Sequence, residues 1–308
     1  MGQPARAAVL GSPIGHSKSP ALHNAAYRHL GLNIRYDAVD VTEDQLPGFM
    51  TGVRSETGWA GLSVTMPLKA AMVAQVEQLA GTAAVLQVLN TVTFDGGTTP
   101  GTTRLTGHNT DVAGIVRAIE YAGGTGETSA VILGAGGTSL AAAAALADLG
   151  VTDLTLCVRT PARAAETAGL AERFGLSVTV VPLQDSAAVV RQSRLVVSTL
   201  PSRAADELAV DPVLVDPILA GGADTEGTRK AGVLLDVAYD PWPSALAAAW
   251  ERRGGKIVPG LEMLLYQGLE QVRLFTGSHF HDEPGVINAM CDAVGLPRRS
   301  PQLPDMAG

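Results

Sequence analysis

Hydrophobic and polar positions in the first third of the chain form short runs that predict strands alternating with helices. Buried strands are predicted over residues 7–10, 36–41, 61–66 and 90–94. Apolar residues at helical spacing predict helices over 20–30 and 68–79. Strands separated by helices indicate a mostly parallel α/β sheet.

A second succession of strands and helices begins near residues 124–126. Strands are predicted over 130–133, 153–158, 177–181, 195–198 and 233–237. Helices are predicted over 139–149, 162–173 and 186–192, with a long amphipathic helix over 261–276. The βαβαβ order is the layout of a dinucleotide-binding half, a doubly wound parallel sheet of the Rossmann type.

A glycine-rich run follows the first strand of this second region: Gly134-Ala135-Gly136-Gly137-Thr138-Ser139. Glycine lets the backbone turn sharply and approach a pyrophosphate, and the next helix begins with N–H groups and a positive dipole end. Such a run can also be no more than a tight turn. Its position between a strand and a helix of a βαβ unit favours nucleotide binding.

The end of the next strand indicates which nucleotide is bound. Enzymes that use NAD usually place a carboxylate there to hold the ribose 2′-hydroxyl. This chain has Arg159, Thr160 and Arg163 instead, with no carboxylate among them. Guanidinium groups pair with a 2′-phosphate, so the sequence predicts NADP as the cofactor. The alternative is that both arginines are solvated surface charges.

Ser17 and Ser19 lie in the segment that joins the first strand to the first helix. Ser19 is predicted to be the N-cap, with Pro20 at the first helical position, and this structural role could be its only one. Two hydroxyls beside a helix N-terminus also suit a substrate carboxylate.

Lys69 and Asp111 are the candidates for proton transfer. Lys69 comes just inside the helix predicted after the 61–66 strand, and Asp111 ends the Asn109-Thr110-Asp111 motif at the proposed hinge between domains. Ligands of α/β sheets bind beside the carboxyl ends of strands, and a buried Lys–Asp pair could exchange protons with a hydroxyl or a ketone. A lone lysine is more often a solvated surface charge.

Composition narrows the class of protein. The chain has 308 residues, enough for two domains, and 46% hydrophobic against 17% charged residues supports buried cores. A net charge of −8 without a basic run argues against a nucleic-acid partner. Neither the N-terminus nor the apolar run 140–149 suits a signal peptide or a membrane span, and two distant cysteines, Cys157 and Cys291, suit a reducing compartment. The expectation is a cytoplasmic protein, monomeric or homodimeric, with no membrane partner.

Six motifs, in this order, resemble the shikimate dehydrogenase family: GSPIGHSKSP, SVTMPLK, LNT, HNTD, GAGGTS and GLEMLLYQ. The resemblance covers residues 7–276, and the SVTMP form is similar to the actinobacterial branch. It implies an NADPH-dependent, reversible reduction of 3-dehydroshikimate to shikimate, a small-molecule substrate on the route to chorismate and aromatic amino acids.

The resemblance also implies substrate-side roles. Lys69 matches the catalytic lysine of the family and Asp111 its partner. Ser17 and Ser19 match the pair that binds the substrate carboxylate. Tyr239 matches a tyrosine near the substrate carboxylate. The groups that match those binding the ring hydroxyls are Thr65, Asn90, Asp111 and Gln267.

On the cofactor side, the resemblance implies that Gly134 to Ser139 form the diphosphate loop. Arg159, Thr160 and Arg163 match the 2′-phosphate clamp. Thr199, Val237 and Gly260 match positions that line the nicotinamide. NADPH carries the hydride, so the protein has to supply positioning and one proton. The proton comes from Lys69 or from a relay through Asp111, and the sequence leaves both open.

Single residues depart from the usual family pattern at four positions: Ser63 in place of Asn, His108 in place of Asp, Leu140 in place of Arg and Val158 in place of Asn. The run Gln87-Val88-Leu89 also replaces the small residues that usually precede Asn-Thr. We expect them to change affinities rather than the reaction. The run 279–283, which contains two histidines and two carboxylates, is interpreted as a polar loop. No metal is expected, because the proposed chemistry needs none.

The predicted fold class is α/β with two domains and a cleft between them. Residues 1–110 and 261–308 are predicted to form a discontinuous α/β substrate-binding domain, and residues 111–260 the Rossmann-type NADP-binding domain. Three alternatives stay open: a quinate/shikimate dehydrogenase with broader substrate or NAD use, a non-catalytic NADP-binding sensor, and an enzyme for another hydroxy- or amino-acid-like substrate. A sensor should lack Lys69 or Asp111, and both are present.

Overall fold

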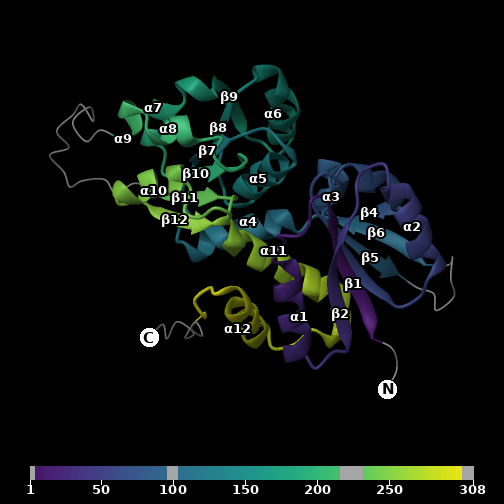
Figure 1. Cartoon of the computed structure of the whole chain (residues 1–308). Helices are drawn as coiled ribbons and strands as arrows, with labels where there is room; N and C mark the ends of the chain where they lie inside the picture. Colours follow the sequence, from purple (N-terminus) through teal and green to yellow (C-terminus); the bar gives the residue numbers. More distant parts are fainter. Residues whose placement is uncertain (1–3, 96–102, 216–231, 300–308) are drawn as a thin grey trace, which may run out of the picture. The chain divides into compact units, whose positions relative to one another are not determined.

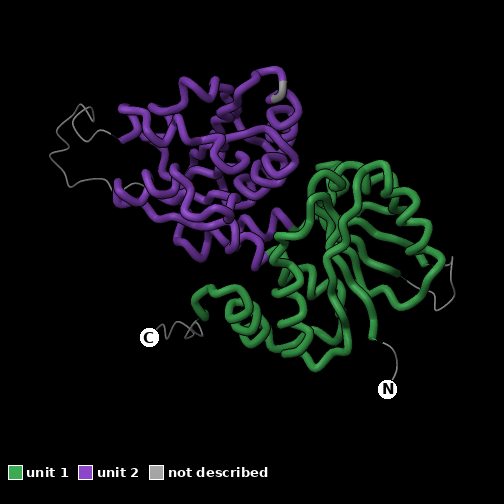
Figure 2. The backbone as a smooth tube through the Cα atoms, viewed as in Figure 1, with its two compact units in different colours: residues 1–110, 267–308 green, residues 111–266 purple. Residues whose placement is uncertain are grey.

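The computed structural model describes residues 4–95, 103–215 and 232–299, with the side chain of Arg163 left out. The chain divides into two compact units, residues 1–110 with 267–308, and residues 111–266 (Figure 2). The second break lies within the helix α11 (Gly260–Thr276), between Tyr266 and Gln267; the domain boundary expected from the sequence lies between residues 260 and 261.

The first unit is built on a mixed six-stranded sheet with the order β2-β1-β3-β5-β6-β4 (Figure 1). Its strands are β1 (Ala5–Gly11), β2 (Ile34–Asp40), β3 (Trp59–Val64), β4 (Gln78–Leu79), β5 (Thr91–Asp95) and β6 (Arg104–His108). The strands β2, β1 and β3 are parallel, but β5 is antiparallel to both β3 and β6. The predicted parallel character therefore holds for only part of this sheet, because β5 and β6 are joined by a short connection, which favours antiparallel pairing.

Helices cover both faces of this sheet. They are α1 (Ser19–His29), α2 (Leu46–Ser55), the 3-10 helix η1 (Ala71–Gln75), α3 (Thr82–Leu86), the C-terminal part of α11, the 3-10 helix η4 (Gly277–His279) and α12 (Glu283–Val294). Successive residues of β3 point to opposite faces. Leu62 and Val64 belong to the core with α2 and η1, whereas Gly61 and Ser63 meet α11.

The helix predicted over residues 68–79 is wrong. After β3 the chain turns, with the Leu68 N–H donating to the Thr65 carbonyl at 2.9 Å, and then forms η1. Next β4 pairs with β6, and the Glu77 N–H donates to the Leu105 carbonyl at 3.0 Å. Pairing at the sheet edge overrides a helical pattern that is already weakened by β-branched valines.

The second unit contains an all-parallel six-stranded sheet with the order β12-β11-β10-β7-β8-β9. Its strands are β7 (Ser129–Leu133), β8 (Asp153–Val158), β9 (Ser177–Pro182), β10 (Leu195–Ser198), β11 (Val233–Asp236) and β12 (Lys256–Pro259). Counted from β7, this is the doubly wound order of dinucleotide-binding sheets, with the switch point between β7 and β10. The Rossmann-type prediction is confirmed, although β12 was not predicted.

Helices flank this sheet on both sides (Figure 1). They are α4 (Asp111–Tyr121), α5 (Gly137–Asp148), the 3-10 helix η2 (Pro161–Arg163), α6 (Ala164–Arg173), the 3-10 helix η3 (Leu183–Asp185), α7 (Ala187–Gln192), α8 (Asp206–Ala209), α9 (Pro212–Val215) and α10 (Ala245–Arg252). Trp250 of α10 lies in the core formed with α7 and α8, and its Nε1–H donates to the Gly232 carbonyl at 3.0 Å. Within the described ranges, no helix combines the length and apolar character that a membrane crossing needs.

The close packing of Gly61 gives a stability prediction. A Cβ at Gly61 would lie 2.1 Å from the Phe275 ring, so Gly61→Ala forces the buried ring or the strand to shift. We expect a loss of about 1–3 kcal/mol in the free energy of unfolding, as is typical of overpacked cores. Urea unfolding followed by circular dichroism measures it.

Gly52→Ala is the matched control, because Gly52 lies in α2 and a Cβ there meets nothing within 4 Å. Alanine favours helix, so the control should be neutral or slightly stabilised. Equal unfolding midpoints for the two variants would contradict the packing argument.

Candidate active site

Ser17 and Ser19 lie where the chain passes from β1 into α1. The Ser19 N–H donates to Ser17 Oγ at 3.3 Å, and the helix begins at Ser19 with Lys18 as its N-cap. The prediction that Ser19 is the N-cap is therefore wrong, because the preceding serine satisfies its N–H and the helix starts one residue earlier. Ser19 is buried and Ser17 half-buried. The N-cap residue makes no side-chain hydrogen bond to the helix.

Backbone hydrogen bonds hold the segments of Thr65, Lys69 and Asn90 together. The Val64 N–H donates to the Asn90 carbonyl at 2.8 Å, and the Leu89 N–H donates to the Lys69 carbonyl at 3.2 Å. Thr65 and Lys69 are half-buried in the turn that follows β3, so Lys69 is not inside a helix as predicted. Three residues predicted from separate motifs thus lie in adjoining segments at one end of β3.

Asn90 and Gln267 are in direct contact. Asn90 Nδ2 donates to Gln267 Oε1 at 3.2 Å, and the Thr110 N–H donates to Asn90 Oδ1 at 2.8 Å. The Thr110 hydroxyl lies 2.9 Å from Asn90 Nδ2 and 3.3 Å from Gln267 Oε1. All three residues are buried, so the amide of Asn90, just before β5, and the amide of Gln267 in α11 form one polar cluster inside the first unit.

Asp111 and Tyr239 belong to the second unit. Asp111 is buried and opens α4, where the positive end of the helix dipole favours its carboxylate. Tyr239 is half-buried in the segment after β11. Burial, with the nearby Asp240 carboxylate as a second cause, raises the pKa of Tyr239 above its ordinary value.

Gly134 allows two strand ends to come together at the switch point of the parallel sheet. Its φ is +111°, and a Cβ there would lie 2.6 Å from Thr199 Oγ1. Its N–H donates to the Cys157 carbonyl at 2.9 Å, while the Thr199 N–H donates to the Leu133 carbonyl at 2.8 Å. Only glycine combines this backbone conformation with such a close approach. The loop after β7 therefore lies against the end of β10, where doubly wound sheets bind nucleotides.

The rest of the loop leads into α5. Gly136 is the N-cap of α5 and has no side chain that could cap the helix. The two glycines, Gly136 and Gly137, are exposed, whereas Ala135 and Thr138 are half-buried. An uncapped helix start offers backbone N–H groups and a positive dipole end to an anion. These residues fit a diphosphate.

Ser139 is turned into the protein. Its hydroxyl donates to the Gly136 carbonyl and lies 3.2 Å from Thr167 Oγ1 of α6. This small, fully buried side chain joins α5 to α6, which is the packing role expected of the third small residue of the loop.

Arg159 and Thr160 come directly after β8, and both are exposed. The strand β8 is the neighbour of β7, with Cys157 opposite Leu133. The two residues therefore follow the strand beside the glycine loop, as a 2′-phosphate clamp requires. The Arg163 side chain, the third part of the predicted clamp, lies outside the described residues.

Thr199, Val237 and Gly260 come at the carboxyl ends of three neighbouring strands, β10, β11 and β12. The Val237 N–H donates to the Ser198 carbonyl at 3.0 Å. A Cβ at Gly260 would lie 2.0 Å from the Val237 carbonyl oxygen, so this contact is between backbones and tolerates only glycine. The structure brings the three predicted nicotinamide positions together on one edge of the sheet.

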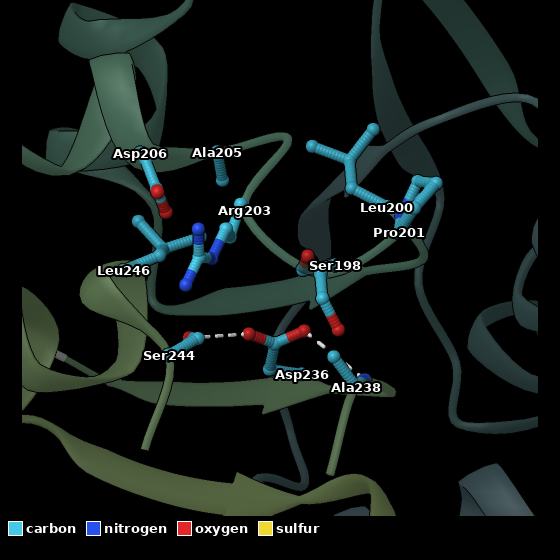
Figure 3. A pocket seen from close by; sticks show the side chains of 11 residues that line it. Ser198, Leu200, Pro201, Arg203, Ala205, Asp206, Asp236, Ala238, Ser244 and Leu246 are labelled. Carbon is cyan, nitrogen blue, oxygen red and sulfur yellow. Dashed lines mark hydrogen bonds between the residues drawn. The ribbon is translucent and has the colours of Figure 1, made fainter. Parts of the chain in front are cut away.

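Asp236 was not singled out from the sequence. It is buried at the end of β11, beside the small pocket of Figure 3. Its carboxylate accepts hydrogen bonds from the Ala238 N–H at 3.3 Å and from the Ser244 hydroxyl at 2.6 Å, and Ser244 caps α10. Burial raises the pKa of Asp236, with the hydrogen bonds acting in the opposite direction. The only sign of Asp236 in the sequence is a carboxylate that ends an apolar strand. Through its hydrogen bond with Ser244, Asp236 connects the segment that carries Val237 and Tyr239 to α10.

Three of the four departures from the family pattern have evident local environments. His108 Nε2 lies 2.9 Å from Thr93 Oγ1 on β5, and burial lowers its pKa. Leu140 and Val158 are buried and apolar. His108 is thus held within its sheet, in agreement with its interpretation as a local variation.

The histidines and carboxylates near residue 280 are engaged with other side chains and with the backbone. His29 pairs with Asp282 at 2.8 Å, Arg273 pairs with Glu283, and His281 Nδ1 lies 2.9 Å from the His279 carbonyl. In the part of the chain that the structure describes, no three His, Cys, Asp or Glu side chains are grouped as metal ligands would be.

Comparisons with known proteins agree with this arrangement. Two family models match the chain: the shikimate dehydrogenase substrate binding domain over residues 9–92, and the shikimate 5'-dehydrogenase C-terminal domain over residues 260–279. A shikimate dehydrogenase (NADP(+)) from Methanothermobacter thermautotrophicus is 34% identical over 287 residues, covering 93% of this chain and 94% of that protein.

Two solved structures are similar along nearly the whole chain. The shikimate dehydrogenase of Mycobacterium tuberculosis has a TM-score of 0.79 at 34% identity, covering 94% of this chain and 100% of that one. The Thermus thermophilus enzyme in complex with NADP(H) and shikimate has a TM-score of 0.72 at 32% identity, again covering 94% and 100%. With fold, site order and identity in agreement over this length, the chain belongs to the shikimate dehydrogenase family.

Proposed function

We propose that this chain catalyses the NADP-dependent, reversible reduction of 3-dehydroshikimate to shikimate. The main support for NADP as the cofactor is the position of Arg159 and Thr160. Both are exposed and directly follow β8, the strand next to the one that leads into the glycine loop. The substrate follows from the family, whose member from Thermus thermophilus has been solved in complex with NADP(H) and shikimate. The SVTMP form and the similarity to the Mycobacterium tuberculosis enzyme support an actinobacterial-like branch.

In this proposal, residues 1–110 with 261–308 bind the substrate and residues 111–260 bind NADP. The loop from Gly134 to Ser139 holds the diphosphate, and Arg159, Thr160 and Arg163 hold the 2′-phosphate. Thr199, Val237 and Gly260 line the nicotinamide side, which fits their shared edge of the parallel sheet. When bound, NADPH supplies the hydride.

The substrate is held by two kinds of group. Ser17 and Ser19, beside the start of α1, bind the carboxylate, with Tyr239 near it. Thr65, Asn90, Asp111 and Gln267 bind the ring hydroxyls. The contact between Asn90 and Gln267 supports this assignment, because it places two amides from distant motifs in one cluster.

Lys69 donates a proton to the ketone oxygen, and its positive charge stabilises the negative charge that develops there. Asp111 orients Lys69 and binds a ring hydroxyl. Direct donation and a relay through Asp111 remain two versions of this step. A cytoplasmic location and a monomeric or homodimeric state belong to the same proposal.

The rival proposal is a quinate/shikimate dehydrogenase that uses NAD. Initial rates of shikimate and quinate oxidation, each with NADP and with NAD, separate the two. Preference for shikimate with NADP supports the proposal, and turnover of quinate with NAD supports the rival. NADP binding without any turnover would indicate the non-catalytic sensor.

Replacing the lysine tests its role in proton transfer. Lys69→Ala should lower kcat for shikimate oxidation about 10²- to 10⁴-fold, the usual contribution of a positioned acid or base. The dissociation constant for NADP, measured by fluorescence titration, should not change. Lys256→Ala, at an exposed position of β12, is the control and should behave as wild type. A Lys69→Ala variant with wild-type kcat would exclude the lysine as the proton donor.

The cofactor choice has its own test. Arg159→Ala should raise KM for NADP roughly 10- to 100-fold, the value of one charge-assisted hydrogen bond, and leave KM for NAD unchanged. Arg173→Ala, an exposed arginine at the end of α6, is the matched control. Equal effects of Arg159→Ala on both cofactors would contradict recognition of the 2′-phosphate.

A further inference from the structure

A buried histidine stands at one end of a chain of hydrogen bonds that leads to the predicted substrate-binding amides. His23 of α1 is fully buried, and its ring stacks on Tyr36 with centroids 4.0 Å apart. Its Nδ1 lies 3.1 Å from the Tyr27 hydroxyl, and its Nε2 lies 3.1 Å from Gln271 Oε1. Burial lowers the pKa of His23 to about 3, so the ring is neutral at ordinary pH and has one N–H to donate.

The orientation of Gln271 follows from its partners. A backbone carbonyl can only accept a hydrogen bond, so the Gln271 end that lies 3.1 Å from the Asn90 carbonyl is Nε2. The opposite end, Oε1, accepts from Ser63 Oγ at 2.8 Å and from His23 Nε2. This fixes the proton of His23 on Nε2, leaving Nδ1 to accept from Tyr27.

The same logic continues to Asn90. Gln271 Nε2 also donates to Thr91 Oγ1 at 3.0 Å, and the Thr91 hydroxyl donates to Asn90 Oδ1 at 2.8 Å. The Thr110 N–H reaches that oxygen too, so Asn90 Nδ2 is the end that donates to Gln267 Oε1. Oε1 of Gln267 therefore points into this cluster as an acceptor, and Nε2, the donor end of the amide, is the other end of the side chain.

We propose that Gln271 is a positioning residue, which, held by neutral His23 and by Ser63, fixes the side-chain orientations of Asn90 and Gln267. The proposal rests on the function given above, in which those two amides bind ring hydroxyls. Gln271 Nε2 donates to the Asn90 carbonyl and to the Thr91 hydroxyl, which in turn donates to Asn90 Oδ1, so the loss of Gln271 releases both restraints.

The proposal also explains the Ser63 departure. A serine hydroxyl has one proton, and at this position it is donated to Gln271 Oε1. Ser63 is 3% exposed, and Gln271 is 1% exposed. Ser63 is shorter than the asparagine usual at this position, and Gln271 of α11 reaches across to its hydroxyl.

Gln271→Met tests the proposal, because methionine keeps the length of the side chain and removes its hydrogen bonds. We expect KM for shikimate to rise roughly tenfold, the effect of misplacing one hydrogen-bonding pair, with kcat and KM for NADP little changed. A merely destabilised enzyme would instead lose active fraction, and so apparent kcat, at unchanged KM. Gln78→Met, at an exposed site on β4, is the matched control.

A double-mutant cycle decides whether Gln271 acts through Gln267. Gln267→Ala should cost less in kcat/KM on the Gln271→Met background than on wild type, because the two changes remove one shared arrangement. The cycle of Gln271→Met with Arg159→Ala should be additive. Additive effects in the first cycle, or a wild-type KM for shikimate in folded Gln271→Met, would overturn the proposal.

Two further measurements keep the test decisive. If Gln271→Met does not fold, His23→Phe takes its place, because it keeps a ring on Tyr36 and removes the donor to Gln271, together with the acceptor for the Tyr27 hydroxyl. If wild type does not turn over shikimate, the proposed function fails, and the crystal structure of the variant tests the positioning by itself. Displaced Asn90 and Gln267 amides would support it, and unchanged amides would overturn it.

Discussion

The hydrogen bond from the Thr110 N–H to Asn90 Oδ1, 2.8 Å long, holds together the segments from which the proposed substrate site of the first unit is built. Asn90 precedes β5, Thr110 immediately precedes Asp111, and the cluster extends to Gln267 of α11. All of these groups are buried, and a buried polar group that loses its partner costs about 1–3 kcal/mol. The cluster therefore has few alternative arrangements, which suits the recognition of ring hydroxyls proposed for Asn90 and Gln267.

The second unit gathers its residues by a different means. Its strands are all parallel, so their carboxyl ends share one edge, and loops far apart in the sequence meet there. Gly134 and Gly260 make this possible at two points where backbone and neighbour approach more closely than any side chain would allow. In the proposed function, cofactor specificity is added by residues that need no precise packing, such as the exposed Arg159.

The sequence predicted what has a local signal. The strand at residues 153–158 was predicted with the bounds that the structure has, and the glycine loop was placed between its strand and helix. The helix over 68–79 failed, because β4 gains its stability from pairing with β6, which no local pattern reports. The one-residue error at Ser19 has a local origin, because the Ser19 N–H donates to the Ser17 hydroxyl, a side-chain contact that competes with capping. The contact between His23 and Gln271 joins residues 248 apart, so neither spacing nor composition could predict it.

That long separation has a consequence for how the chain folds during synthesis. The second unit has all its strands between Ser129 and Pro259 and is complete at Tyr266. The first unit, although it begins the chain, lacks the helix that covers Ser63 and His23 until residues beyond Gln267 have left the ribosome. A ribosome-bound fragment that ends at Tyr266 would thus carry the second unit complete and, ahead of it, a sheet with one apolar face still open to chaperones.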